Sequence, residues 1–207
     1  MEVAAKFTLL HGIRNKTEAI IMKYRTIFIL SIIFYISLCG DTGYPQEENS
    51  RVFSSKFCTV FYYDDVDLKK VNRRINLSFA NFYSPRSYRE NAELSIDNIL
   101  SDKLDAIFNR AQDILDMYPA KIHVAINIYK SQKDLDKVYE EFFNEKNKTV
   151  SFYIYKTNTI YTIESQLNEN ILAHEMSHCI IDHYFVILPP RKIQEMLAVY
   201  VDAHLKD

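Results

Sequence analysis

The sequence predicts an α+β domain, a small mixed β-sheet with helices packed on it. Three observations support this fold class. Short β-branched and aromatic segments alternate with longer amphipathic ones, in the order strand, helix, helix, strand, helix, hairpin, helix, helix. Apolar residues make up 48% of the 207, which is enough to build a substantial core. Glycine is absent after Gly43, so that part of the chain excludes the common glycine-rich phosphate loops and favours regular structure.

The elements follow from hydrophobic spacing and from their end signals. We predict strands at 55–63 and 121–129 and a hairpin over 149–165. Helices are predicted over 64–82, from Ile96 to Pro119, and over 131–143, 166–184 and 191–205, with a loop over 83–95. Asp64 or Asp65 should cap the first helix, and Ser131 should cap the helix at 131–143. The hairpin should turn at 156–158, where Asn158 can take the left-handed conformation. Its second strand, 159–163, is expected at the edge of the sheet.

A targeting segment precedes these elements. Lys23 and Arg25 come before a run of large apolar residues over 27–38, which is followed by Cys39 and Gly40. This is the layout of a secretory signal peptide, and the run is too short to span a bilayer comfortably. The sequence ISLC that ends at Cys39 also resembles a lipoprotein signal, so both kinds of export signal remain open.

The chain is therefore predicted to have three parts. Residues 1–43 would be an N-terminal extension with a signal peptide or lipoprotein signal, residues 44–52 a tether, and residues 53–207 a single domain. We expect an exported protein, which is secreted, periplasmic or anchored through its signal or lipid. The net charge is only −2, with Lys and Arg spread along the chain, so nucleic acid is not expected as a partner.

The stretch AHEMSHCIIDHYF, residues 173–185, has the spacing of a metal site on a helix. His174 and His178 are four residues apart, so their imidazoles project from one helical face and can bind the same Zn²⁺. Glu175 is offset around the helix, where it can take a proton from a metal-bound water. The pattern therefore predicts a zinc site with Glu175 as a general base.

A catalytic zinc site needs a third protein ligand and one open position. His183 lacks the preceding glycine that reverses the chain in proteins with a third histidine. Asp182 could bind the same ion only with strain, because three ligands along one straight helix diverge. Cys179 projects from another face of the helix. Glu195, on the next predicted helix, can supply a single carboxylate oxygen.

Two faces are expected on the helix that carries Glu195. One is apolar and should pack, and comprises Ile193, Met196, Leu197, Tyr200 and Val201. Glu195, Ala198 and Val199 lie on the adjacent face. The small Ala198 should let the two helices approach each other closely beside the carboxylate.

Together, LAHEMSHCII and PPRKIQEMLAVYV resemble the gluzincin branch of zinc metallopeptidases, and the resemblance covers about residues 149–205. In that family a His-Glu-x-x-His helix precedes a helix with a glutamate ligand in the context E-x-x-A-x-Y. The resemblance implies a zincin-like active-site helix followed by a Glu-ligand helix. It implies His174, His178 and Glu195 as zinc ligands, Glu175 as general base, and the last strand of the hairpin as the upper rim of the cleft.

By this resemblance the protein would be a zinc-dependent peptidase acting on a peptide or protein substrate. An extended substrate could pair with the predicted edge strand at 159–163. Larger relatives stabilise the oxyanion with a tyrosine or histidine from a C-terminal subdomain, and the candidates here are Tyr200, His204 and Tyr161, with Tyr200 preferred. The alternative is a catalytically inactive relative that binds peptides, although the intact Glu175 favours an enzyme.

Overall fold

The computed structural model describes residues 50–77 and 95–207, so the predicted targeting segment lies outside the described residues. The chain divides into two compact units, Met1–Pro45 and Gln46–Asp207. Among the described residues, both hydrophobic cores are built from the second unit, so we expect this unit to fold by itself. Within the two described ranges, no helix combines the length and apolar character needed to cross a membrane.

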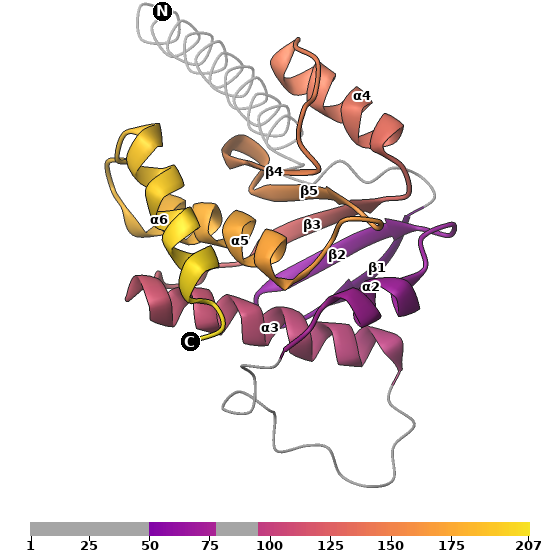
Figure 1. Ribbon diagram of the computed structural model, residues 1–207, viewed down its shortest axis with the longest axis horizontal. Coiled ribbons are helices and arrows are strands. Elements are labelled where there is room, and N and C mark those ends of the chain that lie inside the picture. Colours follow the sequence, from indigo (N-terminus) through magenta and orange to yellow (C-terminus); the bar gives the residue numbers. More distant parts are fainter. Residues whose placement is uncertain (1–49, 78–94) are drawn as a thin grey trace, which may run out of the picture. The chain divides into compact units, whose positions relative to one another are not determined.

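The sheet has five strands in the order β1-β2-β3-β5-β4, which confirms the predicted small mixed sheet (Figure 1). The strands are β1 (Ser50–Ser54), β2 (Cys58–Tyr63), β3 (Val124–Tyr129), β4 (Ser151–Ile154) and β5 (Thr159–Ile163). Strands β2, β3 and β5 run parallel to one another, and β1 and β4 pair antiparallel at the two ends.

Strand β5 is not the edge of the sheet, so the prediction for 159–163 was wrong. It lies between β3 and β4, and all five of its residues are buried because helices cover both faces. The hairpin itself is confirmed, with a short 3₁₀ turn, Tyr155–Thr157, and Asn158 in the left-handed conformation at φ 49°. The outer strand of the hairpin is β4, which forms one of the two edges of the sheet; β1 forms the other.

Strand β1 corrects the predicted tether, because residues 50–52 pair with β2 instead of leading to it. Val52 lies opposite Phe61 and Ser50 opposite Tyr63. Only Phe53 of this strand is buried, so the segment lacks the hydrophobic alternation that marks a half-buried strand.

Five helices accompany the sheet within residues 50–77 and 95–207. They are α2 (Leu68–Arg74), α3 (Ile96–Leu115), α4 (Gln132–Phe143), α5 (Glu169–Tyr184) and α6 (Arg191–His204). Helix α2 is shorter than predicted, and its cap is Asp67 because that side chain accepts from the amides of the first turn. The predicted cap Ser131 is confirmed, and the end of the predicted 64–82 helix, with most of the loop after it, lies outside the described residues.

The helices form layers on the two faces of the sheet (Figure 1). Helices α3 and α5 cover one face, and α6 packs on the outside of both. Helix α4 covers the other face, where Leu135 packs with Phe152 and Tyr161 in a second, smaller core. Helix α5 is thus enclosed between the sheet and α6, and seven of its side chains are completely buried: Leu172, Ala173, Met176, Ser177, Cys179, Ile180 and Ile181.

The packing face of α6 is only partly the predicted one, because Leu197 and Val201 pack against the core as expected but the other three apolar residues do not. Its buried side chains are Ala198 and Val201, whereas Ile193, Met196 and Tyr200 face solvent. A helix with apolar residues on two sides offers two possible packing faces, and the spacing alone does not choose between them. The last turn is held by Arg110 of α3, whose Nη2 donates to the backbone oxygen of His204 at 2.9 Å.

Candidate metal centre

His174 and His178 face each other across one turn of α5. Their Nε2 atoms are 3.3 Å apart. In a tetrahedral zinc site, two nitrogens that each lie about 2.0–2.1 Å from the metal are separated by about 3.3–3.4 Å. The pair therefore already has the separation that a shared zinc ion requires.

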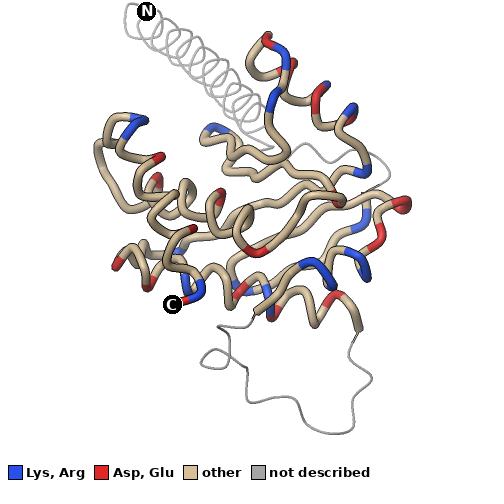
Figure 2. Tube along the Cα trace, in the orientation of Figure 1, with Lys and Arg blue, Asp and Glu red and all other residues tan. Residues whose placement is uncertain are grey.

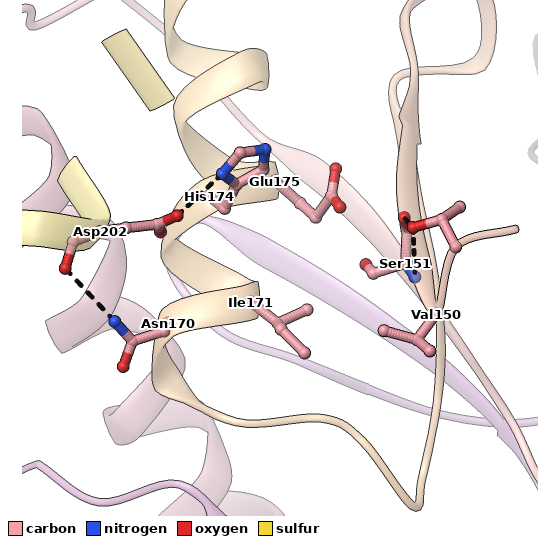
Figure 3. A pocket seen from close by; sticks show the side chains of 8 residues that line it. Val150, Ser151, Asn170, Ile171, His174, Glu175 and Asp202 are labelled. Atoms are coloured by element: carbon pink, nitrogen blue, oxygen red, sulfur yellow. Dashed lines mark hydrogen bonds and ion pairs between the residues drawn. The ribbon is translucent and has the colours of Figure 1, made fainter. Parts of the chain in front are cut away.

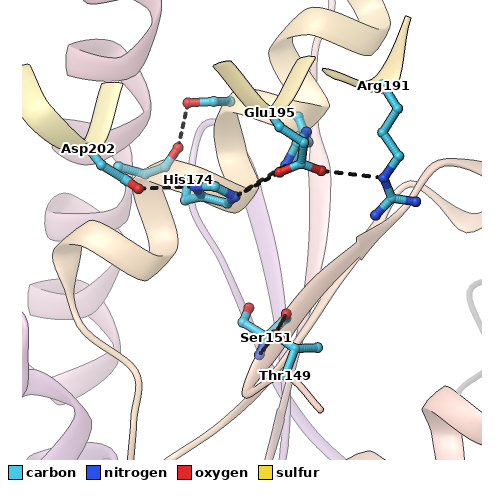
Figure 4. Close-up of polar contacts among 9 residues, drawn as sticks. Thr149, Ser151, His174, Arg191, Glu195 and Asp202 are labelled. Carbon is cyan, nitrogen blue, oxygen red and sulfur yellow. Dashed lines mark hydrogen bonds and ion pairs between the residues drawn. The ribbon is translucent and has the colours of Figure 1, made fainter. Parts of the chain in front are cut away.

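Glu195 completes a triangle of ligand atoms (Figure 4). Its Oε2 lies 3.7 Å from the Nε2 of His174 and 3.7 Å from the Nε2 of His178. A point equidistant from these three atoms lies about 2.1 Å from each, which matches the usual zinc distances to nitrogen and carboxylate oxygen. Helix α6 can come this close because Ala198, which is completely buried, has no bulk to separate the two helices. The three residues therefore fit zinc.

Asp202 contacts the ring nitrogen of His174 that does not face His178. Its Oδ2 lies 3.0 Å from the Nδ1 of His174, and its backbone oxygen accepts a hydrogen bond from the Asn170 side chain at 3.3 Å. The hydrogen bond from His174 to Asp202 raises the pKa of His174. It also favours the tautomer with a proton on Nδ1, which leaves the Nε2 lone pair for a metal. The sequence analysis missed Asp202, although it follows Glu195 by seven residues and so lies on the same side of α6.

The other two candidate ligands also have surroundings that suit metal binding. Burial, reinforced by the neighbouring His174, lowers the pKa of His178 to about 4, so this imidazole is neutral at physiological pH. Arg191 places its Nε 3.4 Å from Oε1 of Glu195. The carboxylate therefore presents one oxygen to the histidines and the other to the guanidinium, as expected of a ligand that binds through one oxygen.

Glu175 lies beside this cluster with only 7% of its surface exposed. Burial raises the pKa of its carboxyl group to about 7, against the opposing effects of His174 and Ser151. The buried Ser151 hydroxyl is near enough to act in this way, although the two groups do not form a short hydrogen bond. In Figure 3 both side chains border one pocket of about 250 Å³. It is lined by Thr149, Val150, Ser151, Asn170, Ile171, His174, Glu175 and Asp202.

The other predicted participants lie elsewhere. Tyr200 is 49% exposed and its ring packs on His204 with centroids 4.0 Å apart, so it does not line the pocket. Tyr161 is buried in the core beneath α4. Asp182 accepts a hydrogen bond from Tyr153 of β4 at 3.1 Å, which makes it a link between α5 and the edge strand. The structure thus brings together His174, His178 and Glu195 with Glu175 beside them, and leaves out Tyr200.

Known proteins add no further information about this site. No family model, curated protein or solved structure matches the chain. The resemblance to gluzincins therefore depends on the His-Glu-x-x-His helix and the glutamate helix alone.

Proposed function

We propose that this protein is a zinc-dependent peptidase, with His174, His178 and Glu195 as metal ligands and Glu175 as general base. The observation that carries the proposal is the triangle of two imidazole nitrogens and one carboxylate oxygen, which has a common centre about 2.1 Å from each atom. Three protein ligands leave one coordination position open, as in catalytic zinc sites. Structural zinc sites usually have four protein ligands.

The chemistry divides between the metal and the side chains. Zinc, when bound, lowers the pKa of its water and polarises the scissile carbonyl. Glu175 borders the same pocket as His174 and would accept a proton from the attacking water as general base. As the water oxygen bonds to the carbonyl carbon and the C–N bond breaks, the same carboxylic acid would pass this proton to the leaving amine. Asp202 keeps His174 in the required tautomer throughout.

Strand β4 supports a peptide as the substrate. It is the edge strand on the side of the pocket, and its first residue, Ser151, lines that pocket. Every second residue of an edge strand directs its backbone N–H and C=O groups away from the sheet, where an extended chain can pair with them. A peptide bound along β4 would therefore pass beside Glu175. The targeting segment predicted in residues 1–43 would place this activity outside the cytoplasm.

One observation favours the alternative, a catalytically inactive protein with the same fold that binds peptides. Tyr200 is half exposed and packs on His204, and Tyr161 is buried in the core beneath α4, so neither is placed as the oxyanion donor expected from the resemblance. Such a donor typically contributes about 10²–10³ in rate. The intact and pocket-facing Glu175 favours the enzyme, because peptide binding alone does not require a buried carboxyl group.

Zinc content measured by elemental analysis on purified residues 46–207 tests the proposal. We expect about one zinc per chain, a sharp loss in Glu195→Ala, and no loss in the control Glu141→Ala, whose side chain is exposed on α4. Glu175→Gln should keep the zinc but lose cleavage of a peptide library. If the parent domain takes up no zinc on reconstitution, the peptidase proposal fails. Stoichiometric zinc without cleavage would favour the peptide-binding alternative.

A further inference from the structure

The connection between α5 and α6, residues 185–190, exposes large apolar side chains to an unusual degree. Val186 is 102% exposed and Ile187 is 86% exposed, so these two side chains touch almost nothing else in the domain. Leu188 and the preceding Tyr184 are also exposed. Exposed apolar side chains are ordinary when scattered singly, but a contiguous group marks an interaction site.

The outer face of α6 extends this apolar surface. Ile193, Met196, Val199 and Tyr200 are all exposed, and at 100° per residue they fall within an arc of about 120°. Helix α6 therefore has three strips: Ala198 and Val201 pack inward, the Glu195 strip faces the histidines, and an apolar strip faces outward. Amphipathic surface helices normally direct charged residues outward. We call the exposed residues Tyr184, Val186, Ile187, Leu188, Ile193, Met196, Val199 and Tyr200 the apolar ridge.

The few charged residues next to the apolar ridge are mainly basic. Between residues 183 and 201 the charged residues are Arg191, Lys192 and Glu195. Glu195 turns its Oε2 to the histidines and its Oε1 to Arg191, so it offsets part of the charge of Arg191, and the net charge of this stretch is +1 (two basic residues and one acidic). Arg191 and Lys192 are exposed at the start of α6, four and five residues after Ile187. Figure 2 shows this arrangement, with no charged segment along the connection itself and basic residues where α6 begins.

From this arrangement we propose that the apolar ridge inserts into the surface of an anionic lipid bilayer. A tip as exposed as Val186 and Ile187 would need a matching pocket on a protein partner, whereas a bilayer accepts any protruding apolar group. Arg191 and Lys192 are exposed close to this tip in the sequence, where they can contact phosphate headgroups, and basic residues beside inserted apolar groups increase binding to anionic lipid. Tyr184 and Tyr200 are suited to the interfacial layer, because each has an apolar ring and a polar end.

Vesicle co-sedimentation tests the proposal with residues 46–207, which lack the apolar run at 27–38 that would itself bind lipid. The vesicles are phosphatidylcholine, alone or with about a third phosphatidylglycerol. We expect the parent domain to sediment with the anionic vesicles and less with the neutral ones. Val186→Ser combined with Ile187→Ser should weaken binding at least about tenfold. Lys192→Gln should weaken only the binding to anionic vesicles.

The matched control is Val52→Ser combined with Tyr155→Ser, which removes two exposed apolar side chains far from the ridge in sequence. Its binding should equal that of the parent domain. Circular dichroism and zinc content should be unchanged in both double variants, so that lost binding is not a folding defect. The proposal is overturned if the parent does not bind anionic vesicles, or if the ridge variant binds as well as the control. Concentration-dependent self-association that disappears in the ridge variant, without vesicle binding, would identify a contact between copies instead.

Discussion

Glu175→Gln should stabilise the metal-free domain above neutral pH, although it removes the proposed general base. Burial raises the pKa of this carboxyl group from 4.5 to about 7 in the folded protein. Below pH 4.5 the group is protonated in both the folded and the unfolded state and has no effect. As the pH rises from 4.5 to 7, the unfolded chain ionises more readily, and the folded state loses stability. Glutamine has nearly the same shape and does not ionise.

The magnitude follows from the size of the shift. One pKa unit corresponds to about 1.4 kcal/mol, so a shift of about 2.5 units costs the folded state about 3 kcal/mol above pH 7. In a domain of this size each kcal/mol changes the melting temperature by roughly 2–4 °C. The metal-free Glu175→Gln domain should therefore melt about 6–12 °C above the parent at pH 8. At pH 4.5 the two should melt at nearly the same temperature.

A second buried glutamate on the same helix provides the control. Glu169 is 5% exposed, and burial alone would raise its pKa. The backbone N–H of Asn76 and the ammonium group of Lys206, each 2.9 Å from one of its oxygens, lower this pKa below its usual value instead. Its ionised form stabilises the fold at pH 8, and this contribution is lost as the pH falls through its folded pKa. Glu169→Gln should therefore lower the melting temperature at pH 8.

Differential scanning calorimetry of the chelator-treated domain at both pH values checks the prediction. Equal melting temperatures for the parent and Glu175→Gln at pH 8 would refute the reasoning, because an ionised carboxylate would then be tolerated in this pocket without cost. Added zinc should abolish the difference in melting temperature between Glu175→Gln and the parent domain at pH 8. A divalent cation beside Glu175 stabilises the charged form and lowers its pKa.

Three further substitutions examine the geometry of the centre. Asp202→Asn should weaken zinc binding about 10–100-fold in a chelator competition, because His174 loses the carboxylate that fixes its tautomer. Ala198→Leu should destabilise the domain by about 1–3 kcal/mol in urea unfolding and reduce its zinc content, since the larger side chain pushes α6 away from α5. Tyr200→Phe should leave the rate of peptide cleavage unchanged, and a fall of about 10²–10³ would instead identify this tyrosine as the oxyanion donor.

The residues of the candidate site were largely predictable because helical spacing determines which side chains meet. His174 and His178 are four positions apart on one helix, so their side chains meet in any fold that contains this helix. Glu195 meets the histidines only because α6 packs on α5. The small Ala198 on the same helix indicated that the two helices could approach this closely. Asp202 could have been found with the same rule of spacing. It was missed because a lone aspartate near the end of a surface helix is usually exposed to solvent.

Features that depend on the choice between two packing arrangements were not predictable from the sequence. Both strands of the hairpin over 149–165 are apolar enough to be internal, and only the parallel pairing of β5 with β3 makes β4 the edge. Likewise, α6 is apolar on two sides, and α5 and α3 determine which side is buried. Local patterns set the type of each element, whereas its neighbours in space set its orientation.

The three strips of α6 limit which amino-acid substitutions this helix can tolerate. Its inward strip is restricted by close packing, its Glu195 strip by metal geometry, and its outward strip by the proposed contact with lipid. Helix α4 differs, because Leu135 is its only fully buried side chain among the residues described. Mutational tolerance should therefore be broad around α4 and narrow all the way round α6. Selection for metal retention and selection for lipid attachment would restrict different sides of the same fourteen-residue helix.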